Sequence, residues 1–368
     1  MRIAQIAPLW ERVPPSTYGG IELVVSLLTD ELVRRGHDVT LFASGDSITL
    51  AKLDSVHPQS LRLDPQIKEC QIYEMLQLAT VYERAAEFDL IHSHMGCAAL
   101  PYAMLSKTPT IHTLHGIFTH DNEKMFTYAK NQPYVSISHS QREPRLGLNC
   151  VATVYNSIDV NSYKFFPTPD DPAYLAFLGR ISPEKGPHHA ITIAKATGIP
   201  LKMAGKIDPV DVEYFDQEIK HHIDGEFIQF LGEADHQMKN NLMGRAIATL
   251  FPITWREPFG LVMIESMAAG TPAIAMNLGA VPEVIAHGIS GFIVNNFDEY
   301  IDAVKNISAI SRQETRAYVS QHFGIDRMVT DYEIVYRNLL TQKFSNNGHL
   351  PICQSQSDLR SAVLNSSN

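Results

Sequence analysis

The first 43 residues read MRIAQIAPLWERVPPSTYGGIELVVSLLTDELVRRGHDVTLFA, from Met1 to Ala43, and carry the pattern that decides the fold. The apolar run Ile3 to Ala7 is typical of a buried strand, and the periodic run Ile21 to Arg35 is typical of an amphipathic helix. Gly36 marks the end of that helix, and Val39 to Ala43 is again strand-like. A strand, a helix and a second strand in this order predict the opening of a βαβ unit with a parallel sheet.

The same alternation continues along the chain and restarts once. Pro167 to Pro172 holds three prolines in six residues, which restrict the backbone to extended forms. We place the domain boundary there, so that residues 1–168 form one Rossmann-like domain and residues 169–325 a second. Further strands are expected at Leu90 to His92, Thr110 to Thr113, Tyr134 to Ser138, Tyr174 to Leu178, Leu201 to Ala204, Ile228 to Leu231 and Ala248 to Phe251, with helices at about Pro187 to Thr197 and Val210 to His222.

The C-terminal part of the chain has two sections. A helix at about 326–342 carries a broad apolar face and is expected to pack back on the first domain. Residues 343–368 are rich in Ser, Asn and Gln with few core residues, so we expect a poorly ordered tail.

The composition excludes several function classes. The chain of 368 residues has a formal net charge of -10, which argues against nucleic acid because binders of the phosphate backbone usually carry a basic face. No apolar run approaches the length of a membrane span. Residues 1–7 lack the pattern of a secretory signal, so we expect a cytoplasmic protein. No thiolate metal site is expected from the scattered cysteines, which are Cys70, Cys97, Cys150 and Cys353.

Two acidic residues eight positions apart mark the second half of the chain. Glu257 precedes a helix expected from about Gly260 to Gly270, and Glu265 interrupts the apolar stripe of that helix. A carboxylate there is costly unless another group accepts its charge. In one interpretation, the helix N-terminus at Gly260 to Val262 binds a phosphate, and the two carboxylates accept hydrogen bonds from hydroxyls. In the other, Glu265 is a buried acid paired with an Arg or Lys, and Glu257 is favoured by the helix dipole.

A second charged motif is FLGRISPEKG, from Phe177 to Gly186, directly after the first expected strand of the second domain. Arg180 and Lys185 stand at the C-terminal end of that strand, where open α/β sheets bind ligands. Two cations there would stabilise a leaving diphosphate as its charge grows. A solvated loop with charges of both signs is the competing interpretation.

Paired glycines, Gly19 and Gly20, precede the first helix. They allow the backbone to approach an anion at the helix start, although an ordinary tight turn would use them equally well.

Histidines are frequent at two strand ends of the first domain. His92 and His112 are expected to be core residues whose ring nitrogens have hydrogen-bond partners. His115 follows a strand and is expected to face a ligand-binding cleft. No His-Glu-x-x-His pattern is present, and no metal site is predicted.

Together these motifs resemble those of glycosyltransferase family 4, the retaining GT-B enzymes that include sucrose synthases and phosphatidylinositol mannosyltransferases. Glu257 and Glu265 match the Glu-x7-Glu motif, in which the first Glu contacts the donor sugar and the second holds the ribose. Arg180 and Lys185 match the Arg and Lys that neutralise the donor pyrophosphate. The resemblance implies that His115 contacts the donor sugar, which gives the catalytic set Glu257, His115, Arg180 and Lys185. It also implies donor-binding contacts from Gly19, Gly20, Arg180, Lys185, Glu257, Phe259, Gly260, Leu261, Val262 and Glu265.

The resemblance also implies a fold and a reaction. The fold is GT-B, an α/β architecture with two Rossmann-like, doubly wound domains facing a central cleft. The reaction moves a hexose from a nucleoside diphosphate sugar, with UDP-glucose favoured, to an acceptor hydroxyl with retention of configuration and without metal or other cofactor. A non-catalytic sugar-nucleotide-binding protein and a GT-B epimerase are the alternatives. A nicotinamide-dependent dehydrogenase is disfavoured because Gly-x-Gly-x-x-Gly is missing after the first strand.

The acceptor is not identified by these motifs. Val154 to Asp159 resembles the family's Pro-Asn-Gly-Ile-Asp segment but has Tyr155 and Ser157 in place of Pro and Gly. Ala7 to Pro15, with Gly205 to Pro209, resembles a bacterial subgroup that includes pterin glucosyltransferases. A small molecule, a lipid and a glycan all stay open as acceptors.

Two arginine pairs bear on location. They fit either a solvated surface or a peripheral contact with the inner face of the membrane, and they are Arg34 with Arg35 and Arg142 with Arg145.

Overall fold

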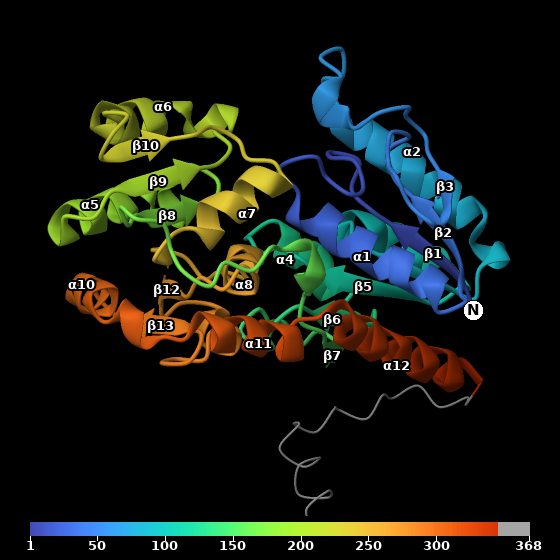
Figure 1. The fold of residues 1–368 in the computed structure, drawn as a ribbon. Helices are drawn as coiled ribbons and strands as arrows, with labels where there is room; N and C mark the ends of the chain where they lie inside the picture. Colours follow the sequence, from blue (N-terminus) through green and yellow to red (C-terminus); the bar gives the residue numbers. More distant parts are fainter. Residues whose placement is uncertain (345–368) are drawn as a thin grey trace, which may run out of the picture.

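Two parallel β-sheets with their helices lie side by side in the computed structural model, which describes residues 1–344 (Figure 1). The first sheet has the strand order β3-β2-β1-β4-β5-β6-β7, and the second has β10-β9-β8-β11-β12-β13. In each sheet the chain first moves one way from its starting strand, β1 or β8, and later returns to the other side of it. The α/β class and the two doubly wound sheets expected from the sequence are therefore confirmed.

The first domain opens with the predicted βαβ unit. β1 (Arg2–Ile6) pairs in parallel with β2 (Asp38–Phe42), and α1 (Gly20–Arg34) joins them. The helix buries Val24 and Leu28 in one core with Ile3 of β1. The other helices and strands of this domain are β3 (Lys52–Asp54), α2 (Cys70–Glu83), β4 (Leu90–Ser93), α3 (Leu100–Leu105), β5 (Thr110–Leu114), α4 (Asn122–Tyr128), β6 (Tyr134–Ser136) and β7 (Cys150–Thr153).

The second domain repeats the plan after the proline-rich segment 167–172, which lies between β7 and β8. Its core includes Phe177 of β8 and Ile274 of β12, both essentially fully buried. Its helices and strands are β8 (Leu175–Leu178), α5 (Pro187–Thr197), β9 (Leu201–Ala204), α6 (Val212–Tyr214), β10 (Ile228–Phe230), α7 (His236–Gly244), β11 (Ala248–Phe251), α8 (Leu261–Ala268), β12 (Ala273–Met276), α9 (Val281–Val284), β13 (Gly291–Val294), α10 (Phe297–Lys305) and α11 (Arg312–His322).

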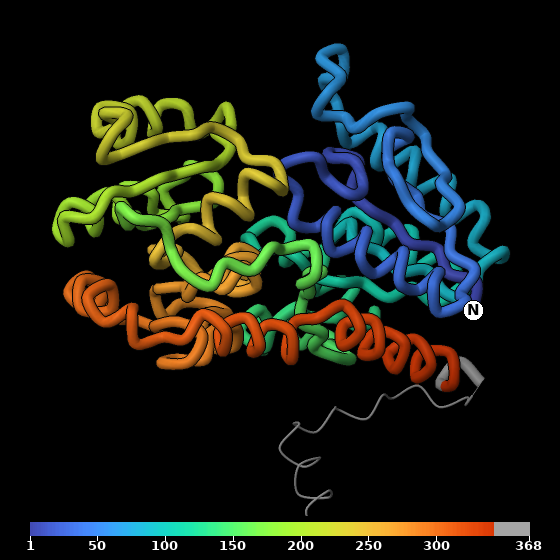
Figure 2. The backbone as a smooth tube through the Cα atoms, viewed as in Figure 1, coloured from blue at the N-terminus to red at the C-terminus, as the bar shows by residue number. Residues whose placement is uncertain are grey.

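The last helix, α12 (Ile325–Phe344), runs from the second domain back across the first and packs against α1 (Figure 2). Tyr332 and Tyr336 of α12 are buried in the same core as Ile3 and Leu28. Because α12 follows α11 of the second domain directly in the chain and buries its tyrosines in the first domain, it ties the two domains together.

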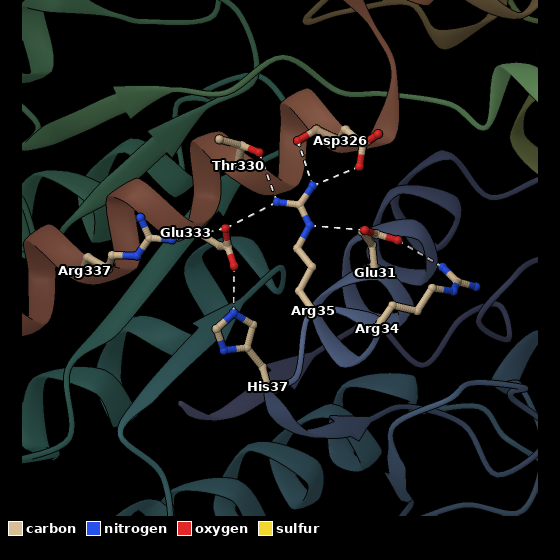
Figure 3. A network of polar contacts seen from close by, with 8 residues as sticks. All are labelled: Glu31, Arg34, Arg35, His37, Asp326, Thr330, Glu333 and Arg337. Carbon is tan, nitrogen blue, oxygen red and sulfur yellow. Dashed lines mark hydrogen bonds and ion pairs between the residues drawn. The ribbon is translucent and has the colours of Figure 1, made fainter.

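A polar network reinforces the packing of α12 on α1 (Figure 3). The Arg35 guanidinium bonds Glu31 at 3.1 Å, Thr330 at 3.0 Å and Asp326 at 3.0 Å. Glu333 accepts from Arg35 at 3.3 Å and lies 2.8 Å from His37 Nε2. The Arg35 guanidinium therefore hydrogen-bonds residues of this protein, most of them on α12.

The expected helix Val210 to His222 is wrong as a single regular helix. The segment is helical throughout, but α6 contributes only three residues and is followed by a π-helical turn, Phe215–Ile219, and a 3₁₀ turn. Ile219 is fully buried at the end of the π turn, in the core of the second domain. A wider turn changes which residues face inward, and a simple 3.6-residue period does not predict it. The predicted disorder of residues 345–368 lies outside the described residues.

Candidate active site

A cleft of about 590 Å³ lies between the two domains and is lined by both. Its wall contains residues that follow strands β1, β5, β8 and β9, namely Pro8, His115, Gly179 and Gly205. The cleft is therefore at the C-terminal ends of both sheets, where ligands bind in open α/β folds. Every predicted site residue lines it, and these are Gly19, Gly20, His115, Arg180, Lys185, Glu257, Phe259, Gly260, Leu261, Val262 and Glu265.

The N-terminus of α8 forms part of the cleft wall. Gly260 precedes the helix with a φ of 84°, and a Cβ there would lie 2.6 Å from Met263 Cε. Only glycine fits this position without displacing its neighbours. The first N–H groups of a helix need partners from outside it, so Leu261 and Val262 offer donors to an anion in the cleft. The Phe259 side chain is buried in the core, which leaves only its backbone for a ligand.

Gly19 and Gly20 bring the start of α1 close to α8. A Cβ on Gly19, whose φ is 147°, would lie 2.6 Å from Pro15 Cβ, and one on Gly20 would lie 3.3 Å from Leu261 Cδ1. The two helix N-termini thus face the same space from opposite domains.

Glu265 is buried at the base of the cleft and has two partners. Lys239 Nζ and the Tyr163 hydroxyl each donate to its Oε1 at 2.8 Å. Burial raises the pKa of Glu265, but the Lys239 ammonium and the two hydrogen bonds outweigh it and hold the pKa below its usual value. The paired-acid interpretation of Glu265 is realised, and the same carboxyl group still lines the cleft.

Glu257 and Lys185 form an ion pair on the wall of the cleft. Lys185 Nζ lies 2.5 Å from Glu257 Oε2, and Trp255 Nε1 donates to the same oxygen at 2.9 Å. The lysine ammonium also lies 4.8 Å from the centre of the Trp255 ring. A Cβ on Gly279 would lie 2.2 Å from the Glu257 carbonyl oxygen, so this glycine lets the loop that carries Glu257 pack closely.

Arg180 is surrounded by acids. Its guanidinium pairs with Glu184 and lies 3.6 Å from Asp208 and 3.7 Å from Asp211. The strand ends here are very close, since a Cβ on Gly205 would lie 1.7 Å from the Gly179 carbonyl oxygen. These carboxylates hold the guanidinium at the end of β8, on the wall of the cleft.

His115 joins the cleft to the interior of the first domain. Its Nε2 lies 2.8 Å from His94 Nδ1, and burial lowers the pKa of His115 to about 4. The ring is therefore neutral at physiological pH. His92 is a satisfied core histidine as expected, because its two ring nitrogens lie 2.7 Å from the hydroxyls of Tyr336 and Thr113. The same expectation is wrong for His112, which is buried but whose ring nitrogens have no partner in hydrogen-bonding geometry among the described residues.

A polar contact crosses the mouth of the cleft. Glu233 of the second domain accepts from Thr17 at 2.6 Å and forms a two-pronged ion pair with Arg62, at 3.1 and 2.7 Å. Arg62 also bonds Glu11 at 2.6 Å. Thr17, Arg62 and Glu11 belong to the first domain, so this contact, hereafter the Glu233 latch, holds the domains together.

Several cleft residues were not predicted from the sequence. Among those lining it with polar or aromatic groups are Trp10, Tyr18, Glu22, Asn156, Lys206, Glu233, Lys239 and Trp255. Asn156 stands in the segment Val154 to Asp159, and its buried Oδ1 has no hydrogen-bond partner among the described residues. Its position directly before Ser157, in the segment singled out by resemblance, was the available signal. Lys239 gave none, since it is one lysine on a polar helix.

The described residues hold neither a side-chain cluster arranged to bind a metal ion nor a helix suited to span a membrane. Within residues 1–344, no cluster of three or more His, Cys, Asp and Glu side chains has a metal-binding arrangement. In the same part of the chain, no helix combines the length and apolar character needed to cross a bilayer.

Two family profiles match successive parts of the chain. The profile described as Glycosyltransferase Family 4 matches residues 18–162, and the one described as Glycosyl transferases group 1 matches residues 161–322. The two matches therefore cover the first and second domains in turn.

Individual proteins give the same picture. The chain is 27% identical to the glycogen synthase of Mycobacterium tuberculosis over 343 residues, which covers 79% of this chain and 81% of that protein. It is 25% identical to the N-acetyl-alpha-D-glucosaminyl L-malate synthase of Bacillus anthracis over 367 residues, covering 88% and 94%. The crystal structure of AviGT4, a glycosyltransferase involved in avilamycin A biosynthesis, superposes with a TM-score of 0.70 at 25% identity, covering 92% and 98%.

Proposed function

Because this chain belongs to the family 4, group 1 glycosyltransferases with the GT-B fold, which use nucleotide-sugar donors, we propose that it moves a hexose from a UDP-sugar to an acceptor hydroxyl with retention of configuration. UDP-glucose is the favoured donor. Family membership supports retention, since the resemblance implies that the departing phosphate helps to take the proton of the acceptor.

One observation carries the proposal. Two cations, two carboxylates and a helix N-terminus from separate parts of the second domain all line one cleft, with His115 contributed by the first. This set matches what a diphosphate-linked sugar needs, which is positive charge at the diphosphate and acceptors for its hydroxyls.

The proposed diphosphate site is the N-terminus of α8 with Arg180 and Lys185. Free N–H groups at Leu261 and Val262 and two fixed cations would stabilise the charge that develops on the leaving nucleoside diphosphate. We assign the neutralising role to these groups, so the proposed reaction needs neither a metal ion nor another cofactor.

The two acids take different parts of the donor in this proposal. Glu265 holds the ribose hydroxyls at the base of the cleft, where Lys239 and Tyr163 keep its carboxylate ionised and fixed. Glu257 and His115 contact the transferred hexose. Closure of the cleft, aided by the Glu233 latch, would exclude water and limit hydrolysis of the donor.

The acceptor is expected to bind beside the first domain. Trp10 and Tyr18 are partly exposed on the cleft, and Lys206 Nζ lies 5.8 and 5.5 Å from their ring centres. Related proteins of similar identity are named for products as different as glycogen and a glucosaminyl malate, so family membership leaves the acceptor open. A pterin, another small molecule, a glycan and a lipid at a membrane surface are the candidates for the screen.

The experiment uses the whole chain with labelled UDP-glucose, other UDP-hexoses and GDP-mannose, each with and without cell extract. Released nucleoside diphosphate and new glycosylated products are measured by mass spectrometry. We expect extract-dependent release from a UDP-hexose, with Arg180→Ala lowering it by about 100-fold or more. Arg145→Ala is the matched control, because Arg145 is an exposed arginine paired with Glu123 away from the cleft.

Other outcomes would favour other functions. Donor binding without turnover with any acceptor would indicate a sugar-nucleotide-binding protein. Interconversion of the donor sugar without transfer would indicate an epimerase.

A further inference from the structure

A continuous chain of hydrogen bonds links His115 at the cleft to Tyr336 of α12 in the core of the first domain. His115 Nε2 lies 2.8 Å from His94 Nδ1, and His94 Nε2 lies 3.2 Å from Gln5 Oε1. Gln5 Nε2 donates to the Tyr336 hydroxyl at 3.3 Å. This hydrogen-bonded chain starts at His115, directly after β5, passes through His94 after β4 and Gln5 within β1, and ends on α12.

The chain continues beyond Tyr336 within the same buried layer. The Tyr336 hydroxyl lies 2.7 Å from His92 Nδ1, and His92 Nε2 lies 2.7 Å from Thr113 Oγ1. Thr113 Oγ1 in turn lies 2.9 Å from the Tyr332 hydroxyl. Tyr336 is thus bonded on one side to Gln5 and on the other to His92.

With the Gln5 amide oriented so that Nε2 faces Tyr336 and Oε1 faces His94, the donors of this hydrogen-bonded chain all run in one direction. Gln5 gives its only proton-bearing atom, Nε2, to Tyr336, so the Tyr336 proton goes to His92 Nδ1. The other end of the Gln5 amide, Oε1, can only accept, so His94 carries its proton on Nε2 and presents a bare Nδ1. That bare nitrogen accepts from a donor, and among residues 1–344 its partner is His115 Nε2, 2.8 Å away.

The three imidazole rings of this hydrogen-bonded chain, those of His92, His94 and His115, are neutral. His92 and His94 are buried, and burial holds the pKa of each well below its usual value, while the pKa of His115 is lowered to about 4. A neutral imidazole has one donor and one acceptor nitrogen, so fixing the proton on one nitrogen defines what the other can do.

We propose that Tyr336 of α12, acting through Gln5 and His94, sets the tautomer of His115, with the proton on Nε2 and the bare Nδ1 available to the cleft as a hydrogen-bond acceptor. Gln5, His94 and Tyr336 are positioning residues, since none of them lines the cleft. His115 Nδ1 has no hydrogen-bond partner among the described residues. It is the ring atom free to accept from a hydroxyl of the bound hexose, a step that rests on the proposed function.

The tautomer itself has a direct test that needs no activity. Nitrogen NMR of the full chain with ¹⁵N-labelled histidine reports which ring nitrogen of each histidine carries the proton, and His115→Gln identifies the His115 signals. The expected result at neutral pH is a neutral His115 protonated at Nε2. A ring protonated at Nδ1, or an equal mixture of the two forms, would overturn the proposal.

A second arm tests whether Tyr336 is responsible. Tyr336→Phe removes the acceptor of the Gln5 amide, so Gln5 becomes free to turn over and the His115 signals should show both tautomers. Tyr134→Phe is the matched control, because Tyr134 is a buried tyrosine of the same domain with one hydrogen bond, to the Ala129 carbonyl oxygen. Its expected His115 tautomer is that of the wild type.

Kinetics then separate positioning from stability. Tyr336→Phe should lower kcat/KM for the donor by about tenfold, while Tyr134→Phe stays within about twofold. Equal losses in both variants, or an unchanged tautomer in Tyr336→Phe, would contradict the proposal. If the wild type shows no transfer to any acceptor, the proposed function fails, and the NMR result still decides the role of Tyr336.

Discussion

Lys185 Nζ lies 2.5 Å from Glu257 Oε2, although the two residues are 72 positions apart in the chain. The cation comes from the loop after β8 and the carboxylate from the loop before α8, and both line the cleft. The two charged motifs of the sequence therefore meet in one place, where each residue limits the position of the other.

Lys185→Ala is expected to weaken donor binding more than it weakens the fold. The substitution removes one cation from the proposed diphosphate site and leaves Glu257 to repel the donor, so the Kd for UDP should rise by about tenfold or more. Titration calorimetry with UDP measures the Kd, and thermal unfolding measures the effect on the fold. Lys195→Ala, which changes an exposed lysine of the same domain, should leave both unchanged. A Kd for UDP unaffected by Lys185→Ala would argue against the proposed diphosphate site.

Glu265 and Lys239 are expected to depend on each other for stability. The pair is buried, with side-chain exposures of 4% and 15%, so removing one partner leaves an uncompensated charge. Glu265→Gln should lower the free energy of unfolding by about 3 kcal/mol, and Lys239→Met should restore part of the loss. Urea unfolding of the two single variants and the double variant gives the coupling. Strictly additive losses would show that the pair makes no net contribution.

The alternation of strands and helices, and the gathering of the charged motifs, could be predicted from the sequence because both depend on local pattern. Strand ends of a parallel sheet form its ligand-binding edge, so Arg180 after β8 was placed at that edge of the second sheet and His115 after β5 at that edge of the first. That the two edges face one cleft was an expectation from the family resemblance. The partners of Glu265 could not be predicted in this way. Lys239, on α7, and Tyr163, in the segment before β8, lie 26 and 102 positions from Glu265, and their side chains meet it only once these segments are packed together.

Arg35 shows the same limit for a surface prediction. In the sequence, Arg34 with Arg35 fitted a solvated surface or a membrane contact equally well. The partners of Arg35 are supplied mainly by α12, about 290 residues later in the chain, so no local rule reveals them (Figure 3). A cytoplasmic location and a peripheral membrane contact stay predictions.

Glu22 is expected to make stability depend on pH. Burial raises the pKa of Glu22 to about 7, from 4.5, and the nearby Glu11 carboxylate adds to the shift. The folded state therefore holds this proton more tightly than the unfolded state does. The resulting stabilisation is complete below about pH 4.5 and is lost as the pH rises to about 7, a change of roughly 3 kcal/mol.

Glu22→Gln provides the measurement for this prediction. Glutamine cannot ionise, so the variant should equal the wild type in unfolding free energy near pH 4 and exceed it near pH 8. Urea unfolding at the two pH values compares them. A difference between variant and wild type that does not change with pH would show that Glu22 ionises normally in the folded protein.

The Glu233 latch is expected to favour the closed cleft. Glu233→Gln keeps the shape of the side chain but removes the ion pair with Arg62 across the cleft mouth. The domains should then separate more often, which raises the radius of gyration in small-angle X-ray scattering and increases KM for the donor several-fold. Glu87→Gln, which breaks an exposed ion pair with Arg84 inside the first domain, is the control. An unchanged radius of gyration and an unchanged KM would show that the Glu233 latch does not stabilise the closed cleft.

The central claim is that the charged residues of the second domain hold one nucleoside diphosphate sugar in this cleft. A crystal structure of the whole chain with UDP-glucose tests it most directly. In that structure we expect the diphosphate at the N-terminus of α8 within hydrogen-bond distance of Arg180 and Lys185, the ribose at Glu265 and the hexose beside Glu257 and His115. A donor bound elsewhere, with these residues making no contact to it, would contradict the account.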